Sequence, residues 1–301
     1  MDRNLALEFV RVTEAAAIAA ASWIGRGDKI AADQAAVDEM RDRFNQIDFA
    51  GRVVIGEGTK DEAPELYEGE RVGSGKGPAM DIAVDPLEGT TNTAFGYPNA
   101  MCVVVSGAKG SLMQMPKGKF YIEKIAVGPQ AASVIDIEAP VKENVQKVAK
   151  ALGKSPKELT VVVLERDRHQ KLINELRKVG VRIHLINAGD LAPGIATCDQ
   201  ESGIDMVMGT GGTPEAVLAA AAIKIMGGQL LCRFPDEKKV LDANDLAKGN
   251  QLTFTATGVI DGPLLQGVRF FNNSITTHSV VMRASSKTIR YITTHHHANT
   301  Q

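Results

Sequence analysis

Acidic residues gather around one short apolar strand and the turn that follows it, between Asp81 and Thr90. Side chains of a strand alternate between its two faces, so Asp81 and Asp85 share a face, and Pro86 then turns the chain so that Glu88 points back toward Asp85. Carboxylates packed this closely repel each other unless a proton or a divalent cation lies between them, and hard oxygen ligands favour Mg²⁺ or Mn²⁺. The segment predicts a metal site, although an acid-capped turn between a strand and a helix gives the same pattern.

A possible phosphate site follows these acids directly. Gly89 and Thr90 occupy the expected start of a helix. Backbone N–H groups there have no partner inside the helix, and together with the helix dipole they attract an anion. A cation site beside a phosphate site is the arrangement that a phosphatase needs.

The same device recurs earlier in the chain. The apolar run that ends at Ile55 is followed by Glu57 and Asp61 among glycines, and Asp33 lies near the beginning of an expected helix. Taken singly, each acid is more simply an exposed loop carboxylate or a helix cap. Because α/β folds keep their chemistry at strand ends, the recurrence favours one shared site.

Two further strand ends carry residues suited to phosphate binding. Gly209 to Gly212 form a glycine-rich turn, with Pro214 at a first helical position and Glu215 in the first turn, but the Lys of a nucleotide P-loop is missing. The stretch 165–169 offers Arg166, Arg168 and His169, which can clamp a second phosphate or can simply begin a solvated helix.

Apolar periodicity predicts the elements that position these residues. Helices are expected near 5–23 and 30–47, and strands at 53–55, 82–84, 101–106 and 120–127. From residue 141, helices and strands alternate, which predicts crossover units and a largely parallel sheet, before a strand-rich end. The fold class is therefore α/β, with a boundary at 153–156 that gives domains 1–155 and 156–301. The histidines at 295–297 are expected to be an exposed tail or tag remnant rather than a metal site.

The composition narrows the class of function. Among 301 residues, 34 Lys and Arg against 36 Asp and Glu give a formal net charge of -2, so no global basic field exists for nucleic acid or an anionic membrane. No apolar run approaches the roughly 20 residues that span a bilayer. Cys102, Cys198 and Cys232 are scattered and odd in number, which favours reduced thiols and a cytoplasmic protein.

With the motifs at 25–29, 55–58, 81–90 and 211–215 in view, the chain resembles the class II fructose-1,6-bisphosphatases from residue 1 to about residue 295. The segment 85–90 also resembles the core of the wider lithium-sensitive, metal-dependent phosphomonoesterase superfamily. The resemblance implies a layered α/β sandwich of two halves with the active site between them. It also implies a homo-oligomer, a dimer or a tetramer, and two or more Mn²⁺ or Mg²⁺ ions per site.

The resemblance also implies residue roles. The metal ligands are Asp33, Glu57, Asp85, Glu88 and Glu215, and the catalytic group comprises Asp61, which is associated with the attacking water, Thr90 and Lys29. The residues that contact substrate are Glu88, Gly89, Thr90, Tyr121, Arg166, Arg168, His169, Ala188, Gly189, Asp190 and Gly212.

Three departures from the family pattern affect these expectations. Family members usually have Asp at the position of Ala188, commonly have Pro at that of Asp167, and have a longer segment between Phe234 and Leu252. Loss of one carboxylate can change sugar selectivity. Besides fructose-1,6-bisphosphate, the candidate substrates are sedoheptulose-1,7-bisphosphate and inositol phosphates, and a non-catalytic sugar-phosphate-binding protein is the remaining alternative.

Overall fold

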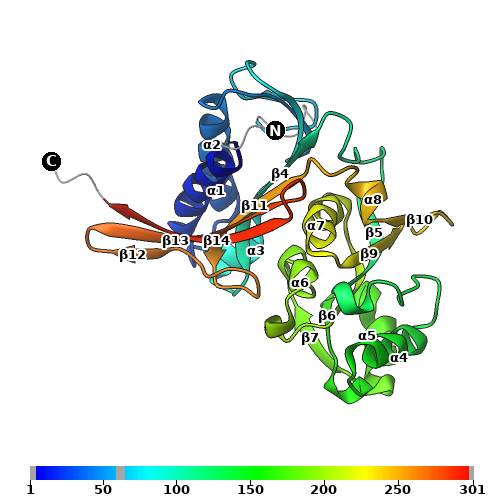
Figure 1. Ribbon diagram of the computed structural model, residues 1–301. Helices are drawn as coiled ribbons and strands as arrows, with labels where there is room; N and C mark the ends of the chain where they lie inside the picture. Colours follow the sequence, from blue (N-terminus) through cyan, green and yellow to red (C-terminus); the bar gives the residue numbers. More distant parts are fainter. Residues whose placement is uncertain (1–4, 59–64, 298–301) are drawn as a thin grey trace. The chain divides into compact units, whose positions relative to one another are not determined.

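Two mixed β-sheets organise the computed structural model, which describes residues 5–58 and 65–297 (Figure 1). The contacts divide the chain into two units, Met1–Gln114 with Gly249–Gln301, and Met115–Lys248. Each unit contains one of the sheets, and each is described by itself.

The first unit is an eight-stranded sheet with helices. Its strand order is β12-β13-β11-β4-β3-β1-β2, and β14 pairs with β13. The elements are α1 (Leu5–Ala21), α2 (Lys29–Asn45), β1 (Ala50–Ile55), β2 (Arg71–Val72), β3 (Ala79–Glu88), α3 (Thr90–Phe95), β4 (Ala100–Ala108), β11 (Thr253–Ile260), β12 (Arg269–Phe271), β13 (Ser274–Arg283) and β14 (Thr288–His297).

Packing of α1 and α2 fixes the beginning of α2, where Asp33 lies. The two helices lie side by side (Figure 1), and Phe9 of α1 packs edge-on against Phe44 and Phe49 at centroid distances of 6.0 and 5.3 Å. Asp28 caps α2, because its carboxylate accepts the N–H of Ala31 at 3.0 Å. The apolar stripe seen in the sequence thus becomes the core of this unit.

The second unit is a six-stranded sheet of order β10-β9-β5-β8-β6-β7. Its strands are β5 (Tyr121–Val127), β6 (Thr160–Leu164), β7 (Arg182–Ile186), β8 (Met206–Gly212), β9 (Gln229–Arg233) and β10 (Val240–Asp242). Its α-helices are α4 (Val141–Leu152), α5 (Gln170–Val179), α6 (Leu191–Ala196), α7 (Thr213–Met226) and α8 (Ala243–Leu246), and its 3₁₀ turns are η1 (Pro129–Ala131), η2 (Pro156–Glu158), η3 (Asp167–His169) and η4 (Gln200–Ser202).

The sheet of the second unit differs from the expected largely parallel one. β6 pairs in parallel with β7 and β8, whereas β5 is antiparallel to both β8 and β9. Because β5 belongs to this sheet, the chain enters the second unit at residue 115, and the predicted boundary at 153–156 lies inside that unit.

The histidines at 295–297 are not a free tail, although His295 and His297 are exposed. They end β14, which pairs with β13 along its whole length. His295 and His296 form hydrogen bonds with Thr276 and Thr277 of that strand, at 3.0 and 2.9 Å. Among the described residues, none of the helices has the length and apolar character that crossing a membrane requires, and the three cysteines are free thiols.

Candidate active site

Two parallel neighbouring strands bring the first acids together. β1 and β3 pair in parallel with Ile55 opposite Ala83, so Glu57 and Asp85 follow strands that end at one edge of the sheet. Gly56 permits the tight exit from β1, because a Cβ there would lie 1.9 Å from the Leu66 carbonyl oxygen. The strand-end prediction of the sequence therefore places both acids at the same edge.

Asp33 approaches this edge from the second turn of α2. A hydrogen bond joins its carboxyl group to that of Glu57, which requires a proton on one of them. Burial raises the pKa of Asp33, against the opposing effect of hydrogen bonds with Thr90 and Glu57. A divalent cation beside this pair would favour the ionised form of both groups.

A β-bulge presents the next pair of acids. The pairing of β3 with β4 shifts register between Asp85 and Glu88, and one carboxylate oxygen of each lies within 4.8 Å of the other. Asp85 also accepts the N–H of Leu87 at 3.1 Å, which fixes its rotamer. Asp81 does not join them, since its carboxylate accepts the N–H groups of Gly110 and Leu112 at 2.7 and 3.3 Å.

Thr90 is held beside these acids. Its hydroxyl lies 2.9 Å from the carbonyl oxygen of Leu87, which accepts its hydrogen bond, and 3.5 Å from Asp33 Oδ1. Gly89 precedes it at φ +90°, where a Cβ would lie 2.8 Å from the Asn99 carbonyl oxygen. The helix that begins at Thr90 has six residues, so its dipole is small and the local N–H groups and hydroxyl matter more.

Lys29 and Asp61, the other two predicted catalytic residues, have no described contact with these acids. Lys29 is exposed at the beginning of α2, and its ammonium lies 5.5 Å from the centre of the Phe95 ring. Asp61 lies outside the described residues.

In the second unit, the carboxyl ends of β6, β7 and β8 carry the predicted substrate residues. The guanidinium of Arg168 lies 5.1 Å from the centre of the Tyr121 ring and donates to the carbonyl oxygen of Thr210 at 2.9 Å. Arg166 donates to the carbonyl oxygens of Glu165 and Asn187 at 2.8 and 2.5 Å. Both arginines are exposed and fixed at one end, so they present N–H groups to an anion in solution.

His169 has a different role from its neighbours. Its side chain is buried, its Nε2 accepts the N–H of Thr210 at 2.8 Å, and its Nδ1 therefore carries the proton donated to the Leu164 carbonyl oxygen at 2.7 Å. Burial lowers the pKa of His169. Because both ring nitrogens have partners within the protein, the imidazole holds the end of β6 against β8 rather than pointing into solvent.

A buried charged group lies behind this edge. The ammonium of Lys124 is 2.8 Å from Asp190 Oδ2, with the side chains only 5% and 7% exposed. Burial, and then the charge of Asp190, raise the pKa of the nearby Glu215, while Lys124 opposes them. Glu215 Oε2 is buried without a hydrogen-bond partner. Sequence reasoning missed Lys124, although a lysine within the apolar strand 122–127 was a signal for a buried ion pair.

The glycines of β8 make room for these charges. A Cβ on Gly212 would lie 1.8 Å from Glu215 Oε2, and one on Gly211 would lie 2.5 Å from Asp190 Oδ2. Gly189 takes φ +79° beside the half-buried Ala188, at the exit from β7. The predicted close approach of a ligand to Gly212 is thus accompanied by a second need for glycine, the space for the Glu215 carboxylate.

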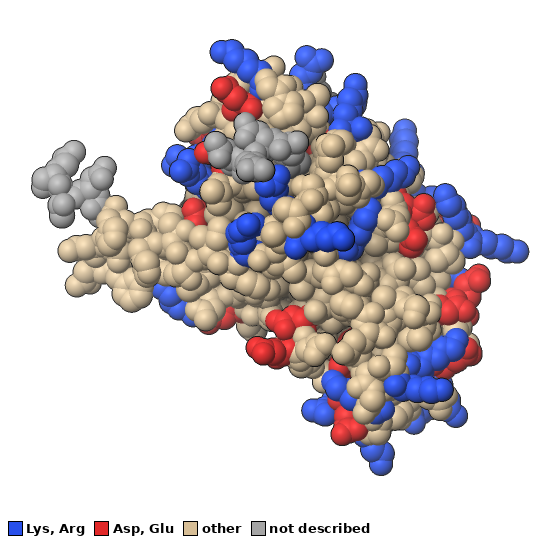
Figure 2. Space-filling view, viewed as in Figure 1, with Lys and Arg blue, Asp and Glu red and all other residues tan. Residues whose placement is uncertain are grey.

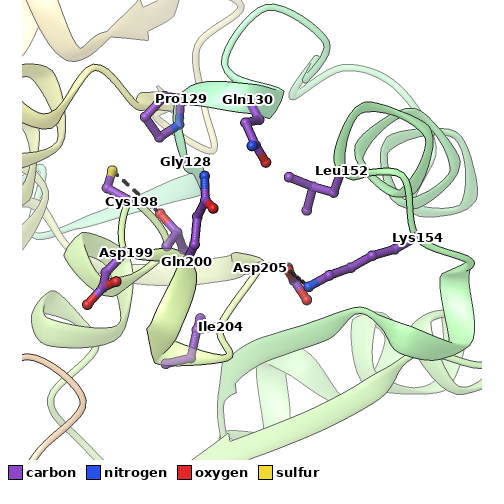
Figure 3. A pocket seen from close by; sticks show the side chains of 11 residues that line it. Gly128, Pro129, Gln130, Leu152, Lys154, Cys198, Asp199, Gln200, Ile204 and Asp205 are labelled. Atoms are coloured by element: carbon purple, nitrogen blue, oxygen red, sulfur yellow. Dashed lines mark hydrogen bonds and ion pairs between the residues drawn. The ribbon is translucent and has the colours of Figure 1, made fainter.

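A separate cavity of about 290 Å³ lies at the opposite end of this sheet, near the amino ends of β6 and β8 (Figure 3). Lys154 and Asp205 both line it, and Lys154 Nζ lies 2.6 Å from Asp205 Oδ1. The other oxygen of Asp205 accepts the N–H of Thr160. None of the predicted site residues lines it.

The donor set fits hard divalent cations. In the first unit the Asp33 carboxyl group bonds to that of Glu57, and carboxylate oxygens of Asp85 and Glu88 lie within 4.8 Å of each other; carboxylate oxygens are the donors that Mg²⁺ and Mn²⁺ select. The partnerless oxygen of Glu215 is a further donor of the same kind in the second unit.

Comparison with known proteins identifies the family. The family model described as bacterial fructose-1,6-bisphosphatase, glpX-encoded, matches residues 3–296. The chain belongs to this family. Fructose-1,6-bisphosphatase 1 class 2 of Escherichia coli (strain K12) is 43% identical over 325 residues, covering 99% of this chain and 96% of that protein. Fructose-1,6-bisphosphatase class 2 of Shigella flexneri matches with the same identity and coverage.

Membership of the glpX-encoded family agrees with how the predicted residues are distributed. Asp33, Glu57, Asp85, Glu88 and Thr90 gather at one sheet edge of the first unit. The residues expected to contact the rest of the substrate, from Tyr121 to Gly212, gather at one sheet edge of the second. In this glpX-type fructose-1,6-bisphosphatase, four of the five candidate metal ligands lie in the first unit. Glu215 and the candidate anion-binding arginines lie in the second.

Proposed function

We propose that this protein hydrolyses the C1 phosphate of fructose-1,6-bisphosphate, releasing fructose-6-phosphate and inorganic phosphate in gluconeogenesis. Family membership supports the reaction. The observation that carries it is the pairing of Asp33 with Glu57 and of Asp85 with Glu88 at the sheet edge that also carries Thr90, because paired carboxylates favour a bound cation, and cations beside a hydroxyl that can contact phosphate suit phosphoester hydrolysis.

Two or more Mn²⁺ or Mg²⁺ ions are the cofactors that we propose. Asp33, Glu57, Asp85 and Glu88 would hold them, and the family resemblance adds Glu215, whose free oxygen is suited to the same task. When bound, such ions neutralise phosphate charge and activate water.

The residues of the chain supply orientation. We assign Thr90 to the scissile phosphoryl group, since its hydroxyl is held between Leu87 and Asp33, and assign to Glu88 and Gly89 the adjoining contacts. Asp61 is proposed to accept a proton from the attacking water, and Lys29 to offset negative charge nearby. The water oxygen forms the new P–O bond, the bond from phosphorus to the C1 oxygen breaks, and fructose-6-phosphate leaves.

The second phosphate is proposed to bind Arg166 and Arg168, with Tyr121 supporting the Arg168 guanidinium from its ring face. His169 positions this pair through Thr210, and Ala188, Gly189, Asp190 and Gly212 are assigned to the sugar. Binding energy at the distal phosphate then positions the scissile one.

Phosphate release tests the proposal. Purified protein with Mn²⁺ or Mg²⁺ is expected to release phosphate from fructose-1,6-bisphosphate and not from fructose-6-phosphate. Glu57→Gln and Asp33→Asn should each lower the rate by about 10²-fold or more, because each removes a carboxylate that would hold a cation against the developing negative charge. Asp38→Asn, on the exposed face of the same helix as Asp33, is the matched control and should retain wild-type activity.

The substrate panel includes sedoheptulose-1,7-bisphosphate and an inositol phosphate. Faster turnover of either would replace the proposed substrate. Wild-type rates in Glu57→Gln would remove the metal assignment, and a protein that binds but never releases phosphate would be a sugar-phosphate-binding protein.

We also propose that the enzyme is a cytoplasmic homo-oligomer, a dimer or a tetramer. Residues 269–278 and 291–297 form a three-stranded arm of β12, β13 and β14 beyond the end of β11. Phe270, Phe271 and Tyr291 are 54%, 61% and 57% exposed on it. Residues 270–282 and 291–297 contain no Asp, Glu, Lys or Arg, and Figure 2 shows the arm as an uncharged surface. An uncharged edge strand with exposed aromatic rings favours pairing with a second copy.

A further inference from the structure

Lys124 is a charged residue in the middle of an apolar strand. It lies on β5 between Ile122 and Ala126, which share its face and are fully buried. Its Nζ is 2.8 Å from Asp190 Oδ2, and both side chains are at least 93% buried. The negative charge of Glu215 also acts on it. One cation is thus enclosed with two carboxylates.

The surrounding backbone is shaped to this arrangement. A Cβ on Gly211 would lie 2.7 Å from Lys124 Nζ and 2.5 Å from Asp190 Oδ2. Any larger residue at 211 would force the pair apart. Burying charges costs several kcal/mol per ion before they pair, and an apolar replacement is often no less stable. A buried pair that also dictates its backbone neighbour is therefore better explained by positioning than by stability.

We propose that Lys124 is a positioning residue for the hydrolysis. Its ammonium holds the Asp190 carboxylate in place for the sugar and offsets the charge of Glu215, so that Asp190 does not turn to a cation in place of the substrate. The partnerless Oε2 of Glu215 then remains the donor that this cluster offers to a metal. This inference rests on the proposed function.

The test is Lys124→Met, which keeps the length of the side chain and removes the charge. Without Lys124, Asp190 loses the ammonium that holds it, and the KM for fructose-1,6-bisphosphate should rise about 10-fold or more. At the same time, removing a buried positive charge near Glu215 should lower the Mn²⁺ concentration for half-maximal activity by about 3-fold or more. The two constants should thus move in opposite directions, which loss of folding alone does not produce.

Two further variants sharpen the result. Lys124→Met with Asp190→Asn removes one charge of each sign, so the half-activating Mn²⁺ concentration should return to near the wild-type value while KM stays raised. Lys154→Met removes the lysine of another Lys–Asp pair in the same unit, at the far end of the sheet, and should change neither constant. Thermal melting accompanies every variant.

The outcomes separate cleanly. An unchanged KM in Lys124→Met, or a KM and a Mn²⁺ requirement that both worsen in proportion to lost stability, would overturn the proposal. If Lys124→Met does not fold, Lys124→Gln, which removes the charge but keeps a hydrogen-bond donor near Asp190, takes its place in both measurements. If the wild type releases no phosphate, the proposed function fails, and calorimetric Mn²⁺ titration of the wild type and Lys124→Met still tests the charge effect.

Discussion

Burial determines the behaviour of the acidic side chains at the candidate site. Asp33 and Glu215 both have raised pKa values because desolvation penalises their ionised forms. A raised carboxyl pKa contributes stability below the pKa of the unfolded chain, and that contribution is lost as the pH rises through the folded value. At neutral pH the metal-free fold therefore bears a cost at these residues, and binding of a cation removes it.

His169 shows the opposite linkage. Burial lowers its pKa, so between the folded value and about 6.5 the unfolded chain binds more protons, and the stability contributed by neutral His169 is lost as the pH falls through that window. His169→Ala should cost about 2 kcal/mol or more at pH 7.5, because the Thr210 N–H and the Leu164 carbonyl lose their partner.

Urea denaturation at pH 7.5 and at pH 5.5 measures both effects. The gap between wild type and His169→Ala should narrow at the lower pH. A gap that stays constant or widens would show that the imidazole is not held neutral.

The sequence indicated which side chains lie at the strand ends, but not which of their atoms already have hydrogen-bond partners within the protein. Glu57, Asp85 and Glu88 converge as their strand-end positions indicated, since parallel strands deliver their carboxyl ends to one edge. Asp81 shares the strand but serves two backbone N–H groups, and the imidazole of His169 is used internally. The N–H groups of Gly110, Leu112 and Thr210 that these side chains bind lie 29 or more residues away, so local spacing could not identify them.

Among the elements, apolar periodicity located helices and strands well because each has its own repeat. The strands that it predicted at 53–55 and 82–84 lie within β1 and β3. The neighbours of each strand were harder to predict. β5 pairs with β8 and β9, about 80 and 100 residues later, and such pairing depends on long-range packing that a local pattern does not encode. The histidines at 295–297 looked like a tail because a run of three histidines has no apolar alternation, although their partner β13 is the preceding strand.

The exit of β1 gives the prediction at the scale of the element. Gly56→Ala places a methyl group where Leu66 O lies 1.9 Å away, so the backbone that carries Glu57 must move. We expect a loss of about 1–3 kcal/mol in stability and a raised Mn²⁺ requirement for phosphate release.

Gly194→Ala, in α6, is its matched control. A Cβ there meets nothing within 4 Å, and alanine favours a helix, so stability should be equal or slightly higher. Unchanged Mn²⁺ activation in Gly56→Ala would indicate that the position of Glu57 does not depend on this turn.

For the whole molecule, division of labour between the two units is the main organising feature. The first holds four candidate metal ligands and continues after the second has been inserted into it at residues 115–248. The return of the chain adds β11 to β4 and then builds β13 and β14 outward from it. This late segment ends in the arm, whose aromatic side chains are more than half exposed.

The arm supplies the prediction for the assembly. β14 is a ten-residue edge strand without the charges that usually guard such edges along 291–297, so a second copy is the partner that it suits. Tyr291→Lys introduces a charge on its exposed face and should shift the protein toward a smaller species in sedimentation velocity at micromolar concentration. Leu7→Lys, at an exposed apolar position on α1, controls for the added charge and should leave the distribution unchanged. Because the substituted residue is remote in sequence from every proposed site residue, metal affinity should be retained in the smaller species. A wild type that is already monomeric, or a Tyr291→Lys distribution identical to that of wild type, would exclude the arm as the interface.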